Sequence, residues 1–94
     1  MSDRLTRTMT IVNRAGMHAR PAAEFVKVAG KYTSSIMVEK DGLEVNGKSI
    51  MGVLMLAAEQ GSRLTVSAEG ADAEAALDDL GALVGKGFFD EEAR

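Results

Sequence analysis

Residues 35–46 read SIMVEKDGLEVN, and this stretch decides how the chain folds. Alternation of apolar with polar side chains predicts strands that have one apolar face. The apolar residues alternate in this way on both sides of Asp41-Gly42: Ile36, Val38, Leu43 and Val45. Asp-Gly is a dipeptide that favours the tight type I′ turn between antiparallel strands. The sequence therefore predicts a β-hairpin whose strands are Ser35–Lys40 and Leu43–Asn46.

The chain before the hairpin predicts a strand followed by a helix. Residues Thr6 to Asn13 are rich in β-branched side chains and alternate in polarity, which is typical of a strand. Apolar residues then recur at helical spacing: Ala22, Phe25, Val26 and Ala29. Gly30 supplies a stop for this helix. Because Pro21 has no N–H and fits only in a first turn, the helix begins at His18 or Ala19.

The chain after the hairpin predicts a second helix and a fourth strand. Residues Ile50 to Ala58 are apolar nearly all round and follow Ser49, which is a preferred N-cap residue. They indicate a short helix that is ended by Gly61. Residues Arg63 to Glu69 alternate between polar and apolar, so they predict a strand.

The last helix is predicted from Asp72 to Lys86, and the acidic tail from Asp90 onward is expected to be mobile. The element order is therefore βαββαβα, without an internal repeat or linker, so residues 1–94 are expected to form a single α+β domain. Every predicted helix has an apolar stripe and the strands alternate. The economical packing is a four-stranded antiparallel sheet with three helices on one face, which leaves the other face wet.

Composition excludes several kinds of chemistry. The 94 residues contain no cysteine and one histidine, so they supply no disulfide, no thiolate zinc site and no multi-histidine metal cluster. The longest apolar run is far shorter than the 18 residues or more that span a bilayer. The N-terminus lacks a signal-peptide pattern, so we expect the protein to be cytoplasmic, without membrane insertion.

The formal charge of −3 conceals an asymmetry along the chain. Residues 1–31 carry six basic against two acidic side chains, a balance of +4, whereas residues 32–94 carry five against twelve, a balance of −7. An anionic ligand is therefore expected to prefer the N-terminal third, unless the charges only solvate the surface. The acidic total and the lack of tryptophan make a nucleic-acid binder a poor interpretation.

His18 is the single imidazole, and it is predicted at or next to the start of the first helix. N–H groups without a helical partner and the positive end of the helix dipole favour a bound anion there, and they disfavour a charged imidazolium. A neutral imidazole is a nucleophile, and Arg20 and Arg14 could hold a phosphoryl group attached to it. The alternative is that His18 is only a polar loop residue or a cap.

The start of the second predicted helix is the other notable feature. Ser49 either acts as a plain cap or becomes phosphorylated, which would add nearly two negative charges at the positive end of a helix. Met51 and Met55 lie four residues apart on this helix. Flexible methionines there either fill the core or form an adaptable docking patch.

Two segments carry a family resemblance. Residues 13–22 read NRAGMHARPA and residues 45–56 read VNGKSIMGVLML. Both closely resemble HPr, the histidine-containing phosphocarrier family of the bacterial phosphoenolpyruvate phosphotransferase system, and the similarity runs from about residue 5 to residue 89. The resemblance implies the open-faced β-sandwich of that family.

The resemblance implies a role for each matching position. His18 matches the histidine that takes a phosphoryl group on Nδ1 from phospho-enzyme I and passes it to a histidine of a IIA component, and Arg20 matches the arginine that steadies the phosphate. Ser49 matches a serine modified by the HPr kinase/phosphorylase of some bacteria. The partner-docking patch is matched by Met17, Ile50, Met51 and Leu54. A carrier of this kind is a phosphotransfer intermediate rather than an enzyme, needs no cofactor or metal, and is expected to be a monomer.

Two interpretations stay open within this resemblance. The ending Phe88-Phe89-Asp90-Glu91 is similar to the nitrogen-related branch of the family, whereas the segment from Lys48 to Gly52 is similar to the sugar-uptake branch. A further alternative is a purely regulatory protein that acts by contact through the helix Ser49 to Ala58, with His18 idle or serving only as a signal.

Overall fold

The computed structural model describes residues 4–89, and its elements follow the predicted order βαββαβα. The predicted acidic tail at residues 90–94 lies outside the described residues. In chain order the elements are β1 (Arg4–Thr10), α1 (Ala19–Ala29), β2 (Ser35–Lys40), β3 (Leu43–Asn46), α2 (Ile50–Met55), β4 (Arg63–Glu69), α3 (Ala73–Gly85) and a 3₁₀ turn η1 (Gly87–Phe89).

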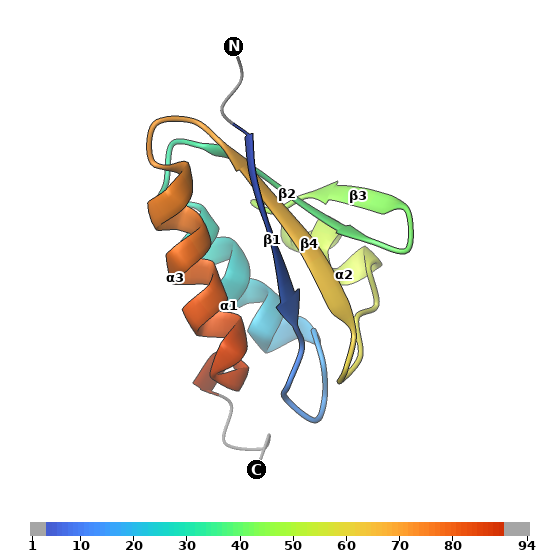
Figure 1. The fold of residues 1–94 in the computed structure, drawn as a ribbon. Helices are drawn as coiled ribbons and strands as arrows, with labels where there is room; N and C mark the ends of the chain where they lie inside the picture. The colour runs from blue at the N-terminus through green and yellow to red at the C-terminus, as the bar shows by residue number, and fades with distance from the viewer. Residues whose placement is uncertain (1–3, 90–94) are drawn as a thin grey trace.

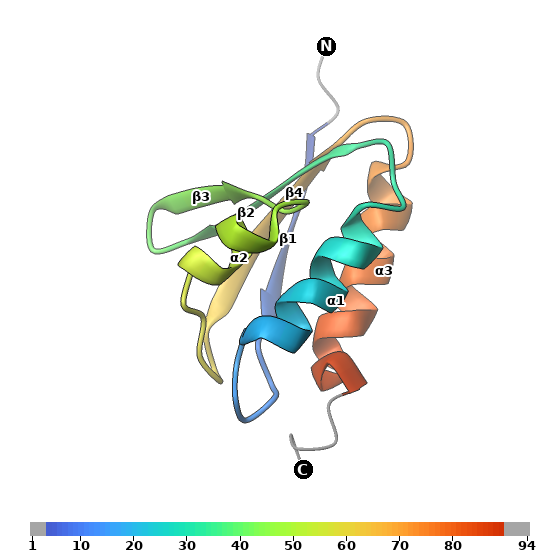
Figure 2. The same ribbon diagram turned by 180° about the vertical axis from the view of Figure 1, so that it is seen from behind.

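The four strands form one antiparallel sheet in the order β1-β4-β2-β3 (Figure 1). Helices α1 and α2 lie behind this sheet in Figure 1 and α3 stands beside β1, and Figure 2 shows the helices from the other side. Helix α3 packs against β1, β4 and α1, whereas the short α2 packs against β3 and α1. The predicted open-faced arrangement, with three helices on one face of a four-stranded antiparallel sheet, is confirmed.

The hairpin of β2 and β3 forms as predicted. Val38 pairs with Val45, and both are buried against the helices. Asp41 and Gly42 have φ angles of 53° and 88°, the positive values that a type I′ turn requires at both central residues. Alternation along the strands therefore directs one row of side chains into the core. The largest fully buried side chains of the core are Phe25, Ile11, Ile36, Leu64, Leu77 and Leu80.

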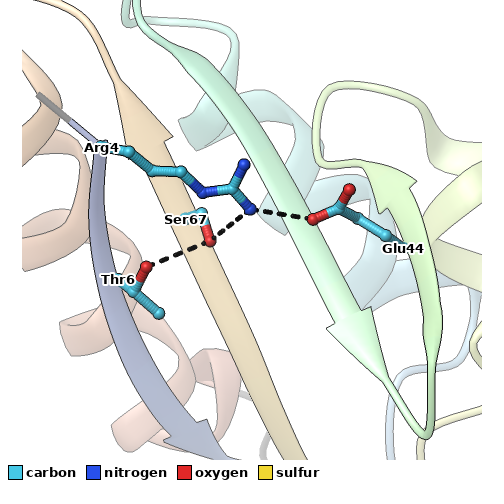
Figure 3. A network of polar contacts seen from close by, with 4 residues as sticks. All are labelled: Arg4, Thr6, Glu44 and Ser67. Atoms are coloured by element: carbon cyan, nitrogen blue, oxygen red, sulfur yellow. Dashed lines mark hydrogen bonds and ion pairs between the residues drawn. The ribbon is translucent and has the colours of Figure 1, made fainter. Parts of the chain in front are cut away.

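The open face of the sheet carries polar side chains, as the alternation predicted. Arg4 of β1 donates to Ser67 of β4 at 3.2 Å and to Glu44 of β3 at 3.0 Å, and Thr6 lies within 3.4 Å of Ser67 (Figure 3). Arg4 and Glu44 are both about half exposed, so their ion pair contributes little to stability. Strands β1 and β3 are the two edge strands of the sheet, so the ion pair between Arg4 and Glu44 spans its open face.

The predicted ends of β1 and α2 were wrong, and β1 also begins two residues earlier than predicted, at Arg4 instead of Thr6. The first strand ends at Thr10 instead of reaching Asn13, and α2 ends at Met55 instead of Ala58. After Thr10 the chain leaves the regular ladder, since the Ile11 carbonyl accepts from Gly61 N–H at 2.7 Å. Helix α2 ends early because Ala57 takes a left-handed φ of 49°. Both departures create the loops that meet beside the candidate site.

Helix α3 is tied to the loop between α1 and β2 by one carboxylate. Asp72, at the N-terminus of α3, accepts hydrogen bonds from the backbone N–H and the hydroxyl groups of Thr33 and Ser34. The hydrogen bond from the Ser34 hydroxyl is the main reason that the pKa of Asp72 is lowered to about 2. Among residues 4–89 no helix is long and apolar enough to cross a membrane.

Candidate functional site

His18 is the N-cap residue of α1. Its backbone is extended, with φ −80° and ψ −171°, and its carbonyl accepts the first helical hydrogen bond, from Ala22 N–H at 3.0 Å. The side chain makes no capping hydrogen bond, and the residue is half-buried. The predicted helix start is therefore confirmed. The imidazole is attached where the positive end of an α-helix favours a bound anion.

The loop before His18 is a tight turn closed by a buried amide. Asn13 is fully buried; its Nδ2 donates to the Gly16 carbonyl at 2.7 Å, and its own carbonyl accepts from Gly16 N–H at 3.1 Å. Gly16 has a φ of 73°, and a Cβ atom there would lie 2.5 Å from the carbonyl oxygen of Ala58. Only glycine therefore allows the loop to approach the chain after α2 this closely.

The two arginines of the predicted site are exposed. Arg20 is the second residue of α1, so the backbone places it in the first turn, two residues after His18. Arg14 lies within the turn that Asn13 closes. A guanidinium in each position adds positive charge to the end of α1 that already favours an anion.

Ser49 is the N-cap of α2, as predicted. Its Oγ accepts a hydrogen bond from Gly52 N–H at 3.1 Å. The preceding residue, Lys48, extends its ammonium to the Tyr32 carbonyl at 2.7 Å, just beyond the C-terminus of α1. The start of α2 is therefore fixed both by its own cap and by a contact with the end of α1. Ser49 itself is half-buried.

The predicted apolar patch is exposed for only part of its members. Ile50 and Met51 are 39% and 69% exposed, and Leu54 is half-buried. Met17 is a correction: it is 4% exposed and belongs to the core, since its N–H is bonded to the Ala58 carbonyl and the chain turns inward there. Met55, 65% exposed and one turn after Met51, extends the patch in its place.

The contact between the His18 loop and the chain after α2 is what sequence reasoning missed. Figure 2 shows the loop before α1 and the loop after α2 meeting at one end of the molecule, and the bonds from Met17 and Gly61 join them. In the sequence, only Gly16 and Gly61 indicated this contact. A glycine indicates a turn, but it does not show which other segment the turn contacts.

The molecule also has a groove of about 460 Å³ between β1 and α3. Neither His18 nor Arg20 is among its lining residues. Within residues 4–89, no three acidic or histidine side chains gather in a way that could hold a metal ion. The candidate site is thus a position at the start of α1, a helix that packs against α2, which carries the exposed apolar patch.

The comparisons with known proteins agree with this geometry. A family model described as the phosphorylation site of the phosphotransferase HPr component matches residues 5–86. The phosphocarrier protein HPr of Cupriavidus necator is 42% identical over 88 residues, which cover 94% of this chain and 99% of that protein. The crystal structure of HPr-C-His from Thermoanaerobacter tengcongensis has a TM-score of 0.89 and 47% identity, covering 93% of this chain and 98% of that one.

A third relative is the Bacillus subtilis catabolite repression protein Crh. Its crystal structure has a TM-score of 0.72 and 46% identity, covering 79% of this chain and 85% of that one, and it is described as an intertwined dimer with a swapped domain. The fold and these matches define the class: this is a phosphocarrier protein of the phosphotransferase system. Within that class, the chain belongs to the HPr family.

Proposed function

We propose that the protein carries a phosphoryl group on His18, taking it from phospho-enzyme I and passing it to a histidine of a IIA component. In the first transfer the lone pair of Nδ1 attacks phosphorus, a P–N bond forms, and the bond to the donor breaks with its electron pair returning to the donor. The onward transfer reverses these roles. The observation that carries the proposal is the position of His18, a half-buried residue whose imidazole is attached at the N-cap of α1.

The helix start supplies what a phosphoryl group needs. Phosphoryl transfer depends on an in-line arrangement of donor and acceptor and on positive groups that neutralise the spread charge. The first turn of α1 presents its dipole and N–H groups, and Arg20 stands in that turn. Its planar guanidinium suits two phosphate oxygens at once. The catalytic assistance then comes largely from the partner proteins.

Partner docking is assigned to the exposed side of α2. Ile50, Met51 and Leu54 form a small apolar patch, whereas Met17 is buried in the core. Helices α1 and α2 pack against each other, so the patch and His18 lie on adjoining elements. Phosphorylation of Ser49 by an HPr kinase/phosphorylase would set a negative charge at the edge of this patch and weaken docking to enzyme I.

We further propose that the protein works in the cytoplasm as a monomer. Sugar-uptake and nitrogen-related roles both use a carrier of this shape, and the choice of IIA partner separates them. Light scattering after size-exclusion chromatography tests the oligomeric state: one mass near that of a single chain is expected, and a concentration-independent dimer would contradict it.

Regulation by contact is the second candidate function, and the similarity to Crh favours it. Onward transfer separates the two functions. Phosphorylated wild-type protein, mixed with a purified IIA component, should lose its phosphoryl group to that partner. The His18→Ala variant should lose transfer completely, whereas a pure contact regulator would keep its regulatory activity in that variant. Stable phosphorylated protein that no IIA component can discharge would contradict the carrier proposal.

A further inference from the structure

The loop that presents His18 does not hold its shape alone. Residues 11–17 lie against residues 57–62, the segment that joins α2 to β4. Three backbone hydrogen bonds connect the two segments: Met17 N–H donates to the Ala58 carbonyl at 2.8 Å, Gly61 N–H to the Ile11 carbonyl at 2.7 Å, and Ile11 N–H to the Ser62 carbonyl at 2.9 Å. Residues 57–62 therefore support the His18 loop, and this segment is named the seat.

The seat has a shape of its own that depends on left-handed backbone. Ala57 and Gly61 have φ angles of 49° and 92°, and the Ser62 hydroxyl accepts from Glu59 N–H at 3.0 Å. This internal bond closes a compact turn over residues 59–62, which contains Gly61. The seat therefore has an internal hydrogen bond in addition to its bonds with the His18 loop.

One side chain of the seat reaches across to the His18 loop. Gln60 is exposed, and its Nε2 donates to the Val12 carbonyl at 3.0 Å. Together with the Met17 bond, this contact holds both ends of the turn that precedes His18. Because Gln60 buries little surface, its contact contributes little to folding and acts mainly on the orientation of the loop.

We propose that Gln60 is a positioning residue for phosphoryl transfer at His18. It fixes the Val12 end of the loop, so that the imidazole points at the donor when a partner docks on α2. This rests on the proposed carrier function. Reactions of positioned groups are sensitive to small displacements, so a looser loop lowers the rate of transfer within the complex without lowering the affinity of docking.

The test compares three variants of the full chain. Gln60→Ala removes the donor, and Gln60→Lys retains an N–H donor that can reach the Val12 carbonyl. Glu59→Ala is the matched control, an exposed neighbour in the same seat whose backbone N–H bonds to the Ser62 hydroxyl. Three quantities are measured for each variant: the kcat and KM of phosphorylation by enzyme I, the hydrogen-exchange rate of the Met17 amide, and the midpoint of thermal unfolding.

In Gln60→Ala we expect kcat to fall about three- to tenfold, which corresponds to one lost neutral hydrogen bond. The Met17 amide should exchange faster, while KM and the unfolding midpoint stay near the wild-type values. Gln60→Lys should recover most of the rate, and Glu59→Ala should resemble the wild type in all three quantities.

The proposal is overturned if Gln60→Ala and Glu59→Ala give the same kcat and the same Met17 exchange. It is also overturned if Gln60→Ala loses rate only together with unfolding stability and Gln60→Lys does not recover it, since Gln60 is then structural. If the wild type itself is never phosphorylated on His18, the carrier function fails first, and Gln60 has no transfer to position.

Discussion

The hairpin turn at Asp41-Gly42 and the turn before His18 are both tight connections that use left-handed glycine, yet they are stabilised differently. At the hairpin, Gly42 has a φ of 88°, a Cβ there would touch nothing within 4 Å, and its N–H donates to the nearby Glu39 carboxylate at 2.6 Å. At the other turn, Gly16 lies against Ala58, far away in sequence. The hairpin turn is therefore stabilised by residues close to it in the sequence, whereas the turn before His18 depends on a segment that is distant in the sequence.

Replacing each glycine by alanine is the strongest way to break this comparison. Both changes place a Cβ on left-handed backbone, which costs about 1–2 kcal/mol. In Gly42→Ala this backbone strain should account for the whole loss of unfolding free energy, and phosphotransfer should be unchanged. Gly16→Ala also forces the His18 loop off the Ala58 carbonyl, so its loss of unfolding free energy should be larger and transfer should fall more than tenfold. Urea unfolding and a phosphotransfer assay measure the two effects, and equal behaviour of the variants would refute the distinction.

The second prediction concerns charge in the same two regions. Arg20→Ala should slow phosphotransfer about 10- to 100-fold, the value of a hydrogen bond to a charged group, with little change in stability. Arg20→Lys should lie between, because lysine keeps the charge and loses the planar fork. Lys40→Ala removes one positive charge from the hairpin and should leave transfer unchanged. Equal losses of stability and transfer in Arg20→Ala would show that this arginine is structural.

Two substitutions at Ser49 distinguish its effect on folding stability from its effect on docking to enzyme I. Ser49→Ala removes the cap that Gly52 N–H uses, so the free energy of unfolding should fall by about 1 kcal/mol. Ser49→Asp keeps a capping oxygen and adds a charge beside the apolar patch, so it should retain stability while raising the KM for enzyme I several-fold. Steady-state kinetics with both variants check this. An unchanged KM in Ser49→Asp would remove the regulatory role proposed for this position.

The smallest effect is expected from Asp72, far from both turns. Its folded-state pKa of about 2 lies below the ordinary 3.8, so the ionised carboxylate stabilises the fold at neutral pH. That contribution is lost as the pH falls from about 4 towards 2. In urea unfolding between pH 2 and 6, the wild type should exceed Asp72→Asn in stability at the upper end, and the difference should shrink towards pH 2. A difference that does not vary with pH would contradict the assigned hydrogen bonds.

Local signals were enough to predict most of the fold. The bounds of β2, β3 and β4 follow from alternation and turn residues, and the start of α1 follows from Pro21. The site could be predicted only in its parts. His18, Arg20 and Ser49 take the predicted helix-start positions. The burial of Met17 and the seating of its loop on Ala58 could not be predicted, since both depend on a contact between segments that no local periodicity encodes.

The central claim is that the turn before α1 presents His18 as a phosphoryl acceptor, and one measurement tests it most directly. The protein is incubated with phosphoenolpyruvate and purified enzyme I, and the products are examined by intact mass and by peptide mapping under alkaline conditions. One acid-labile phosphoryl group on His18 is expected, and none in the His18→Ala variant. An unmodified wild-type chain, or a phosphoryl group that persists in His18→Ala, would contradict the account.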